Sequence, residues 1–428
     1  MKHIFILCIL LFTPLIAQAE EQIHIYISAP GRNKIPIALP KPVSKQPAAT
    51  ELYQVIKNDL ELSGWVEIVE PATYLEKEGT SARLGEFTFE NWDSVDALAL
   101  AKTTLEYTDN RYRSEIWVYD IAGRKKLGAK AFNSSAKHIR NLGHKIANEI
   151  IKQLTGQEAP FNTRFGYVND VSGKKEVYIM DFDGANPQRV TRNKTINLQP
   201  AWSPDNHKLS FTSYISGNPD LYLADLRSGR IFQLSSREGI NIGADWHPAG
   251  DSLVATLSPD GNPDIYTLSS QTGRTLKRLT NHPGIDVSPS FSPDGSKITF
   301  VSERSGGAQI YVMNADGSGV KRVSFAGTHN TDPTFSPDGS KIAFVSRAGN
   351  FDVWVVDIDG SNLIRITQDM GDNEDPTWSP DGNYLAFSST RTGSSQIWMS
   401  TADGAHQVQL SSGKGNYTNP DWSSPVTW

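Results

Sequence analysis

The sequence is poor in cysteine, in basic excess and in long apolar runs. Its single cysteine, Cys8, lies in an apolar stretch at the N-terminus, so the chain beyond that stretch has no disulfide, thiolate metal site or cysteine nucleophile. No later stretch is apolar enough to form a transmembrane helix. The net charge of −6 supplies no basic excess for neutralising phosphates, which argues against a general nucleic-acid binder.

Familiar catalytic motifs are also missing. The sequence has no Gly-x-Ser-x-Gly elbow, no His-Glu-x-x-His zinc site, no phosphate-binding glycine loop and no dinucleotide fingerprint. His138 and His144 are six residues apart in a stretch with helical spacing, so they do not share a face as metal ligands would, and we expect both at the surface. We therefore expect no enzyme, no metal and no cofactor.

Residues 1–19 resemble a secretory signal peptide. Lys2 gives a basic start, residues 4–16 are apolar, and Ala17-Gln18-Ala19 is a small-residue cleavage site. An uncleaved membrane anchor is the alternative, but the apolar run is too short to span a bilayer. A lipoprotein is disfavoured because Cys8 lies in mid-run with no small residue before it. We expect a mature chain that begins at Glu20, lies outside the cytoplasm and does not insert into a membrane.

A repeat fills the C-terminal part of the chain. The segment DPTFSPDGSKIAFVSR (332–347) has close counterparts that begin at 199, 288 and 375. Pro337 suits the second position of a type I turn and Gly339 its last position, and alternating apolar residues then predict a strand. The aromatic residues before the turns are spaced by 44, 45, 44, 43 and 44 residues: Trp202, Trp246, Phe291, Phe335, Trp378 and Trp422.

Each repeat contains four strand-like runs, which is the content of one propeller blade. The first unit, residues 164–191, has three such runs and no aromatic strand before it, whereas the segment around Trp422 is one spare copy of that strand. If the spare strand completes the first blade, the ring closes with six blades and leaves no exposed edge. An open solenoid is the alternative, but it would leave the first blade incomplete. We expect the aromatic residues to pack between blades.

The part before the repeat has an α+β pattern. We expect strands at 22–28 and 65–69, and a helix at 48–64 with Thr50 as its N-cap and Gly64 as its stop. Residues 91–109 start helical and end strand-like, a hairpin follows, and residues 134–156 form an amphipathic helix closed by Gly156. The predicted organisation is a signal peptide (1–19), an N-terminal α+β domain (20–158) and an all-β six-bladed propeller (159–428).

A polar column precedes the aromatic residues by five positions. Its members are Asn197, Asn241, Asp286, Asn330, Asn373 and Tyr417. Because the column has the period of the repeat, we expect its members at equivalent places in the loops that enter the aromatic strands, where they form a polar rim around one mouth of the channel. Turn capping is the alternative role. Acidic rim members could hold a cation or a partner's basic side chain. Neighbouring loop residues that extend the rim are His329, Asp332, Glu374 and Asp375.

The order of signal peptide, small α+β domain, six x-P-x-[WF]-SPDG blades and closing strand resembles the TolB family. This family is the soluble periplasmic component of the Tol–Pal system of Gram-negative bacteria, and the resemblance covers the whole chain. It implies a monomeric adaptor and no enzyme. The family binds the lipoprotein Pal at one mouth of the propeller channel and TolA through its mature N-terminal segment, and it supports outer-membrane integrity and constriction during cell division.

Carried onto this sequence, the resemblance assigns the two partners to two sets of residues. Pal would bind the rim described above. TolA would bind the segment 20–31, with Glu20, Glu21, Gln22, Ile23, His24, Ile25, Tyr26, Ile27 and Ser28 as its contact residues. At 246–249 the sequence has WHPA instead of WSPD, which leaves the rim contacts of that blade open.

Two competing functions remain. A secreted enzyme that acts on sugars or peptides in the channel would need carboxylates there, and its candidates are Asp286, Asp332 and Asp375. A scaffold that binds nothing at the rim is the other.

Overall fold

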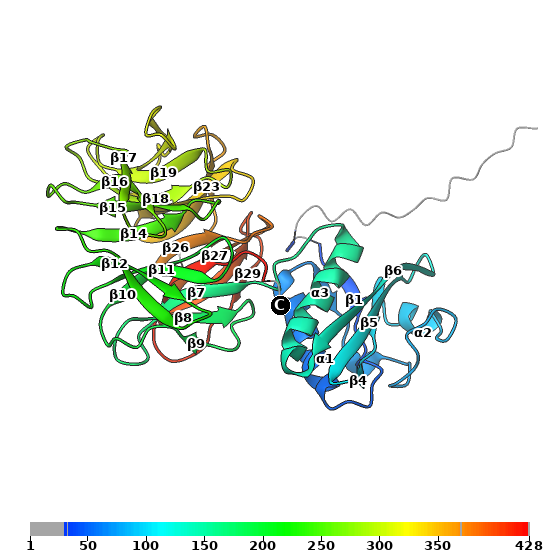
Figure 1. Ribbon diagram of the computed structural model, residues 1–428. Helices are drawn as coiled ribbons and strands as arrows, with labels where there is room; N and C mark the ends of the chain where they lie inside the picture. Colours follow the sequence, from blue (N-terminus) through cyan, green and yellow to red (C-terminus); the bar gives the residue numbers. More distant parts are fainter. Residues whose placement is uncertain (1–29, 32, 369, 427–428) are drawn as a thin grey trace, which may run out of the picture.

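The chain forms an N-terminal α+β domain beside a six-bladed β-propeller (Figure 1). The computed structural model describes residues 30–31, 33–368 and 370–426. The fold class predicted from the sequence is confirmed. The strand expected at 22–28 lies outside the described residues.

The N-terminal domain is built on a six-stranded mixed sheet. Its order is β2-β1-β3-β5-β4, and β6 also pairs with β5. The strands are β1 (Ile35–Ala38), β2 (Val66–Ile68), β3 (Ala99–Thr103), β4 (Glu106–Thr108), β5 (Arg111–Asp120) and β6 (Lys125–Ser135). The helices are α1 (Ala48–Ser63), α2 (Glu90–Asp93) and α3 (Ile139–Thr155), with 3-10 turns at Pro71–Thr73 and Ala136–His138.

The two long helices pack together on one side of this sheet. Gly143 of α3 lies where they meet, and a Cβ added there would come within 2.6 Å of a Val55 methyl group on α1. The helices end as predicted, at Gly64 and Gly156, which have φ of 70° and 75°. The prediction of Thr50 as N-cap is wrong: α1 already begins at Ala48, and its first turn has no side-chain cap.

The propeller consists of six four-stranded antiparallel sheets. Blade 1 contains β7 (Arg164–Asn169), β8 (Glu176–Asp181), β9 (Gln188–Arg189) and the closing β30 (Tyr417–Trp422). Blade 2 contains β10 (Asn197–Trp202), β11 (Lys208–Ser213), β12 (Asp220–Asp225) and β13 (Arg230–Ser235). Blade 3 contains β14 (Asn241–Trp246), β15 (Ser252–Leu257), β16 (Asp264–Ser269) and β17 (Thr275–Arg278).

The remaining blades follow the same order. Blade 4 contains β18 (Asp286–Phe291), β19 (Lys297–Ser302), β20 (Gln309–Asn314) and β21 (Lys321–Arg322). Blade 5 contains β22 (Asn330–Phe335), β23 (Lys341–Ala348), β24 (Asn350–Asp357) and β25 (Ile364–Arg365). Blade 6 contains β26 (Asn373–Trp378), β27 (Tyr384–Thr392), β28 (Ser394–Thr401) and β29 (Gln407–Gln409).

The ring closes as the sequence predicts. The C-terminal β30 pairs antiparallel with β7, with Trp422 opposite Phe165, and so supplies the inner strand of the first blade. Trp422 is 7% exposed, and its indole nitrogen donates to Thr163 Oγ1 at 2.7 Å.

The Ser-Pro-Asp-Gly turn has the predicted geometry. In blade 5, Gly339 has φ 71° and its N–H donates to Ser336 O at 2.8 Å. The Ser336 hydroxyl accepts from Lys341 N and donates to Asp338 Oδ1 at 2.6 Å, so the turn is closed from both sides. The aromatic residues pack between blades, as predicted: Trp202 belongs to one cluster with Val177 and Ile179 of blade 1 and Phe211 of blade 2.

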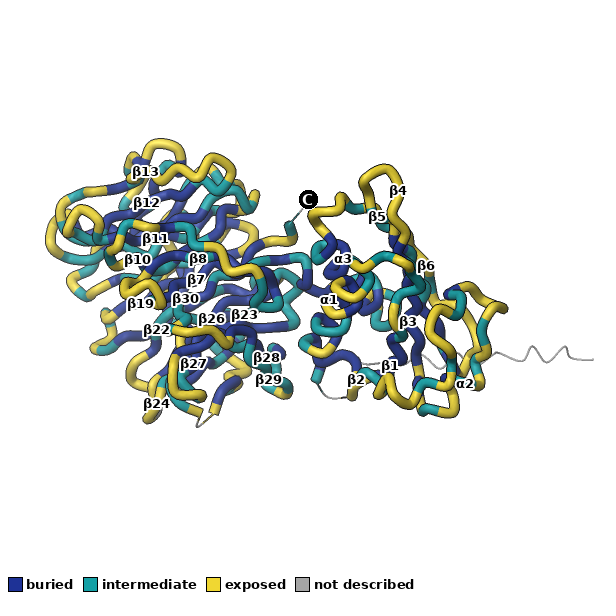
Figure 2. The backbone as a smooth tube through the Cα atoms, turned by 90° about the horizontal axis from the view of Figure 1, so that it is seen from below, coloured by how far each residue is buried: buried dark blue, intermediate teal, exposed yellow. Residues whose placement is uncertain are grey.

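The two domains share a hydrophobic core. Helices α1 and α3 lie next to the propeller (Figure 1). Buried segments of the two domains face each other at this junction (Figure 2). One cluster includes Leu60 and Ile146 of the N-terminal domain together with Phe182, Tyr384 and Trp422 of the propeller. Among the described residues, no helix has both the length and the apolar character needed to cross a membrane.

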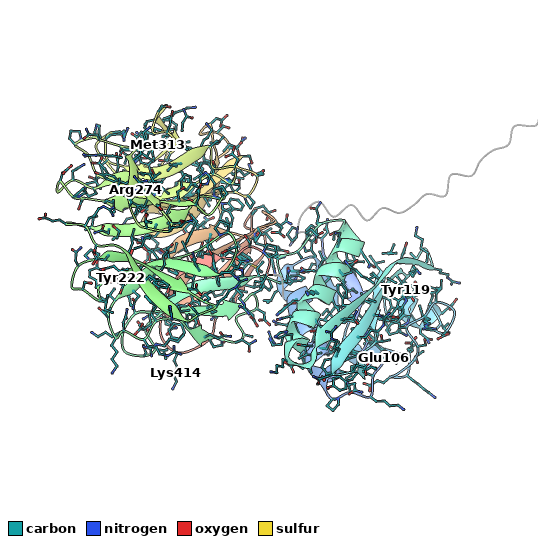
Figure 3. All side chains as sticks on the ribbon, in the orientation of Figure 1. Glu106, Tyr119, Tyr222, Arg274, Met313 and Lys414 are labelled. Carbon is teal, nitrogen blue, oxygen red and sulfur yellow. The ribbon has the colours of Figure 1, made fainter. Side chains whose placement is uncertain are left out.

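Both domains have buried side chains in their interiors (Figure 3). Tyr119 is fully buried inside the N-terminal domain, and Tyr222 and Met313 are buried within blades. Glu106 is exposed on β4, and Lys414 is exposed in a loop. Hollows in the described chain include the channel, a groove between blades 1 and 2 and a cleft in the N-terminal domain.

Candidate functional site

The channel is lined by a bulge that every inner strand repeats. The inner strands are β30, β10, β14, β18, β22 and β26, and the pairing register of each shifts after its second residue. The third residue has a left-handed backbone with φ between 49° and 59°, which turns it toward the channel. These third residues are Gln199, Gly243, Ser288, Asp332, Asp375 and Asn419.

The channel is narrow and acidic. A cavity of about 160 Å³ is lined by three residues from each inner strand, among them the carboxylates of Asp245, Asp332, Asp375 and Asp421 and no basic side chain. Asp421 Oδ2 accepts from Trp202 N at 2.7 Å, and Asp245 Oδ2 accepts from Phe291 N at 2.8 Å, so these two carboxylates tie neighbouring inner strands together.

Asp332 and Asp375 lie beside each other in the channel. Asp375 accepts from Asn419 Nδ2 at 2.7 Å and from Ser388 Oγ at 2.9 Å. Burial, together with repulsion from Asp375, raises the pKa of Asp332 to about 7. Burial also raises the pKa of Asp421 to about 7. The channel therefore attracts positive charge and holds protons more tightly than an open carboxylate would.

The polar column has a different place from the one predicted. Asn197, Asn241, Asp286, Asn330 and Asn373 are the first residues of the inner strands and are fully buried, so the expectation of exposed loop residues is wrong for all five. They connect structural elements. Asn330 Nδ2, for example, donates to Gln309 Oε1 of the preceding blade at 2.8 Å. Tyr417 is half-buried and stacks on Tyr167.

The side-chain amides of this column donate to a second set of repeated polar residues, which was not predicted from the sequence. The third strand of each blade has a buried acid or amide as its first or third residue: Glu176, Asp220, Asp264, Gln309, Asp352 and Gln396. In five of the blades a hydroxyl beyond the fourth strand donates to it, as Thr367 Oγ1 does to Asp352 Oδ1 at 2.7 Å. The signal was visible as a polar residue before VYIMD, LYLAD, IYTL and their counterparts, at the same spacing as the aromatic residues.

His329 and Glu374 lie exposed on the channel-mouth face, which we define as the face where the inner strands begin. It includes the loops between the second and third strands and the loops that enter each inner strand. His329 borders a surface hollow with Arg347, and Asp332 and Asp375 lie just inside the channel. Of the predicted rim, the structure therefore brings these four residues to the mouth or the channel.

Exposed apolar side chains lie on the same face. They are more than a third exposed, and each is in a loop between second and third strands or next to the start of an inner strand. They are Val171, Ile196, Ile215, Ile285 and Met370. Exposed apolar side chains that are contiguous mark interaction sites or ligand-binding grooves.

The N-terminal domain packs against the opposite face, at blades 6 and 1. Tyr384, at the start of β27, donates its hydroxyl to Ser63 O at 2.7 Å. Arg140 of α3 pairs with Asp183 in the β8–β9 turn at 2.6 Å. His138 is exposed, as expected, but the expectation of a surface position for His144 is wrong, because it is 3% exposed and pairs with Asp59.

Comparison with known proteins decides the family. The family model described as "TolB beta propeller domain" matches residues 151–350 and 327–426, and "TolB amino-terminal domain" matches residues 23–127. The Tol-Pal system protein TolB of Bordetella pertussis is 31% identical over 301 residues, which are 70% of this chain and 67% of that protein. The chain belongs to the TolB family.

Other TolB relatives match over shorter regions. The Tol-Pal system proteins TolB of Syntrophotalea carbinolica and Geobacter sulfurreducens are 37% and 36% identical over 43% and 48% of this chain. The matched regions span 44% and 49% of those two relatives, so this chain covers about half of their length. The crystal structure of TolB from Acinetobacter baumannii has a TM-score of 0.82 and 28% identity, and the match covers 92% of this chain and 98% of that one. The resemblance to the TolB family that the sequence indicates is thus confirmed.

Proposed function

We propose that this chain is a periplasmic adaptor of the Tol–Pal system. In this role it binds the lipoprotein Pal at the channel-mouth face and TolA through residues 20–28, and so supports outer-membrane integrity and constriction during division. Family membership supports the role, because the relatives are named as Tol-Pal system proteins. Residues 20–28 lie outside the described residues, so the TolA contact rests on the sequence resemblance alone.

The observation that carries the Pal proposal is the composition of the channel-mouth face. Exposed apolar residues such as Ile215 (53% exposed) and Val171 (52% exposed) lie on the same face as the acidic Glu374. A protein interface commonly has apolar anchors at its centre and charged groups at its edge. The rim residues that we propose as Pal contacts are therefore the accessible ones, His329, Glu374, Asp332 and Asp375. The buried polar column supports them from inside the propeller.

An enzyme in the channel is less well supported. Asp286 is buried away from the channel and pairs with Arg304 at 3.0 Å, so it does not join Asp332 and Asp375. Asp375 already accepts several hydrogen bonds from neighbouring groups. A cavity of about 160 Å³ is also small for a sugar or peptide substrate, since ligand pockets usually exceed about 300 Å³.

The Pal site is tested by titrating purified Pal into variants in a calorimeter. Ile215→Ser on the channel-mouth face should weaken binding by about 1–3 kcal/mol, as expected when an apolar anchor is lost. The matched control is Ile231→Ser, on the outer strand of the same blade, because Ile231 is 42% exposed and lies off the channel-mouth face. Equal affinity of both variants and the unchanged protein for Pal would place the docking surface elsewhere.

The TolA contact is tested by deleting residues 20–28. The deletion should abolish TolA binding and leave the melting temperature nearly unchanged, because a segment at the start of a chain can be removed at little cost if it is not part of the core. The same protein should still bind Pal, which shows that its propeller is intact. A deletion that lowers stability by several kcal/mol would instead identify the segment as part of the core.

A further inference from the structure

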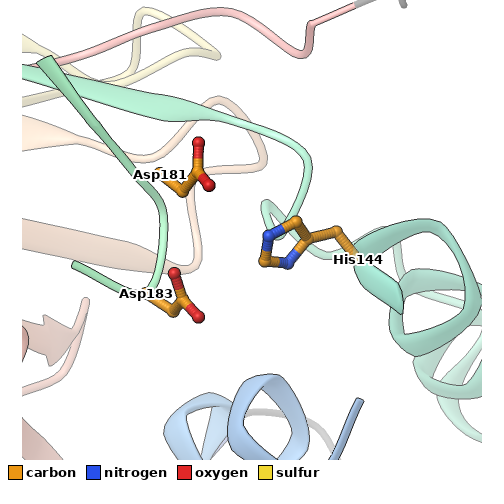
Figure 4. A group of neighbouring side chains, drawn as sticks. All are labelled: His144, Asp181 and Asp183. Carbon is orange, nitrogen blue, oxygen red and sulfur yellow. The ribbon is translucent and has the colours of Figure 1, made fainter. Parts of the chain in front are cut away.

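A histidine and two aspartates meet where the two domains join. His144 comes from α3, and Asp181 and Asp183 come from the end of β8 and the turn after it. One ligand atom from each lies within 4.8 Å of the others, and the imidazole faces the two carboxylates (Figure 4). His144 is 3% exposed, so the group is part of the interdomain interior.

One nitrogen of this imidazole already has a hydrogen-bond partner. His144 Nδ1 lies 2.7 Å from Asp59 Oδ2, and Asp59 is completely buried. In the neutral imidazole this carboxylate favours a hydrogen on Nδ1, which leaves the lone pair of Nε2 available. Nε2 is buried and has no hydrogen-bond partner. A carboxylate on the remote nitrogen is the usual support of a metal-bound histidine, because it fixes the tautomer and the ring orientation.

The two aspartates also accept hydrogen bonds that hold them near His144. Arg140 Nη2 donates to Asp183 Oδ2 at 2.6 Å, and the same guanidinium forms an ion pair with Asp181, whose Oδ2 lies 3.5 Å from Arg140 Nε. Further donors to the pair are Asn186 Nδ2 on Asp181, and Asn58 Nδ2 and Ala185 N on Asp183. A carboxylate has about four acceptor positions, so these bonds leave lone pairs for another partner.

The charges of the group favour one more cation. Asp59, Asp181 and Asp183 bring three negative charges, and Arg140 and Arg164 bring two positive charges. With a neutral imidazole the cluster therefore carries one unbalanced negative charge inside the protein, where charge is costly. A proton on Nε2 or a bound metal ion would balance it.

We propose that His144 Nε2, Asp181 and Asp183 form a site for a divalent transition-metal ion that links the N-terminal domain to the propeller. One imidazole nitrogen and two carboxylate oxygens are donors typical of Zn²⁺, whereas Ca²⁺ and Mg²⁺ prefer oxygen donors alone. Tetrahedral Zn²⁺ sets its donors about 3.4 Å apart. Donors that are up to 4.8 Å apart must therefore close by roughly 1.4 Å when the ion binds.

Direct metal titration tests the site in the full chain without an affinity tag. Co²⁺ is the probe, because its visible absorption reports a nitrogen and oxygen coordination sphere, and Zn²⁺ is added in competition. We expect one Co²⁺ per chain, displacement by Zn²⁺, and weaker binding at acidic pH, where the imidazole is protonated. Zn²⁺ should raise the melting temperature because it joins two domains. Absence of saturable binding would overturn the proposal and leave a proton or water as the partner of Nε2.

Variants separate this site from adventitious binding. His144→Gln should abolish the Co²⁺ absorption band and the shift in melting temperature. Asp59→Asn removes the carboxylate that orients the imidazole, and it should weaken Co²⁺ binding by 10- to 100-fold. His138→Gln, an exposed histidine on the preceding turn, is the matched control and should bind as the unchanged protein does. If His144→Gln does not fold, Asp183→Asn provides the same test from the propeller side. Equal affinity in His144→Gln, Asp183→Asn and His138→Gln would show adventitious binding only.

Discussion

At the residue scale, a polar position that repeats with the blades is not necessarily exposed. Asn241 shows why. Its Oδ1 accepts from Ser235 Oγ at 2.6 Å and from Arg237 N at 3.1 Å, and its Nδ2 donates to Arg237 O at 2.7 Å. These groups belong to the segment that leads from blade 2 into blade 3. The amide therefore fixes the entry of the inner strand, and its period follows from the period of the strands.

Replacing this amide should affect stability rather than recognition. Asn241→Ala should lower the free energy of unfolding by about 1–3 kcal/mol, because the backbone and hydroxyl groups around it lose a buried partner. Urea denaturation followed by fluorescence measures the change. Glu374→Ala, at an exposed rim position, should stay within about 0.5 kcal/mol. An Asn241→Ala protein with unchanged stability would contradict the structural role of the column.

Protonation of Asp332 should make the stability of the propeller depend on pH. Its pKa is raised from 3.8 to about 7. Between these two pH values the folded state therefore keeps a proton that the unfolded state has released. The stabilisation is present below about pH 4 and is lost as the pH rises through about 7. Since each pKa unit corresponds to about 1.4 kcal/mol and Asp332 is only partly buried, the loss should be on the order of 2 kcal/mol.

Asp332→Asn tests this dependence. The free energy of unfolding of the variant should vary less between pH 4 and 8 than that of the unchanged protein, and the variant should be the more stable one at pH 8. Some dependence should remain, because the pKa of Asp421 is raised in the same direction. Asp294→Asn is the control, since the pKa of this exposed turn residue is lowered to about 2 and its effect lies below this pH window. Parallel pH profiles of Asp332→Asn and the unchanged protein would be inconsistent with a proton held in the channel.

At the scale of the element, the blade depends on its aromatic residue. Trp378 ends β26 and is 7% exposed. It belongs to a cluster with Val353 and Val355 of blade 5 and with Leu385 and Phe387 of blade 6. A side chain of this size fills space that two adjacent sheets share, so its removal leaves a cavity that neither sheet can close alone.

Trp378→Ala should therefore lower the free energy of unfolding by about 3–5 kcal/mol. Phe325→Ala is the control, because this aromatic side chain is 68% exposed, and it should cost less than about 0.5 kcal/mol. Thermal and urea unfolding of both proteins provide the comparison. Similar losses for the two variants would mean that the aromatic residue before each turn does not carry the contact between blades.

At the scale of the whole molecule, the two ends of the propeller sequence meet in blade 1. The closing strand β30 pairs with β7, and the core cluster that contains Trp422 also contains residues of α1 and α3. Closure of the ring and docking of the N-terminal domain therefore involve the same core. Loss of the last strand should disturb both.

A chain that ends at residue 416 tests this coupling. Without β30, blade 1 loses its inner strand and exposes the edge of β7, so we expect the cooperative melting transition to be lost and the protein to aggregate. A synthetic peptide of residues 417–426 added in trans should restore part of the transition, since its pairing partners are intact. A truncated chain that melts cooperatively at the original temperature would show that blade 1 is stable without the closing strand.

The sequence by itself determined the propeller. Six aromatic strands at a nearly constant spacing, turns with Ser-Pro-Asp-Gly chemistry and one spare terminal strand specify repeated local structure and its closure. Each of these signals lies within a short stretch of sequence and recurs in every repeat. A correct prediction of one blade therefore applies to all six. The C-terminal ends of α1 and α3 were equally predictable, because glycine readily takes the left-handed conformation that ends a helix.

Only the tertiary structure decided which repeated polar residues are exposed. Asn330 and Asp332 are two positions apart on β22, yet the first is fully buried and the second lies in the channel. A strand alternates its faces and would put both residues on one side, but the bulge after Thr331 and the left-handed backbone of Asp332 separate them. The position of His144 was likewise decided by tertiary contacts. Its neighbours are Asp59, 85 positions earlier in the sequence, and a turn of the other domain. Sequence spacing cannot reveal such a contact, because the packing of two domains creates it.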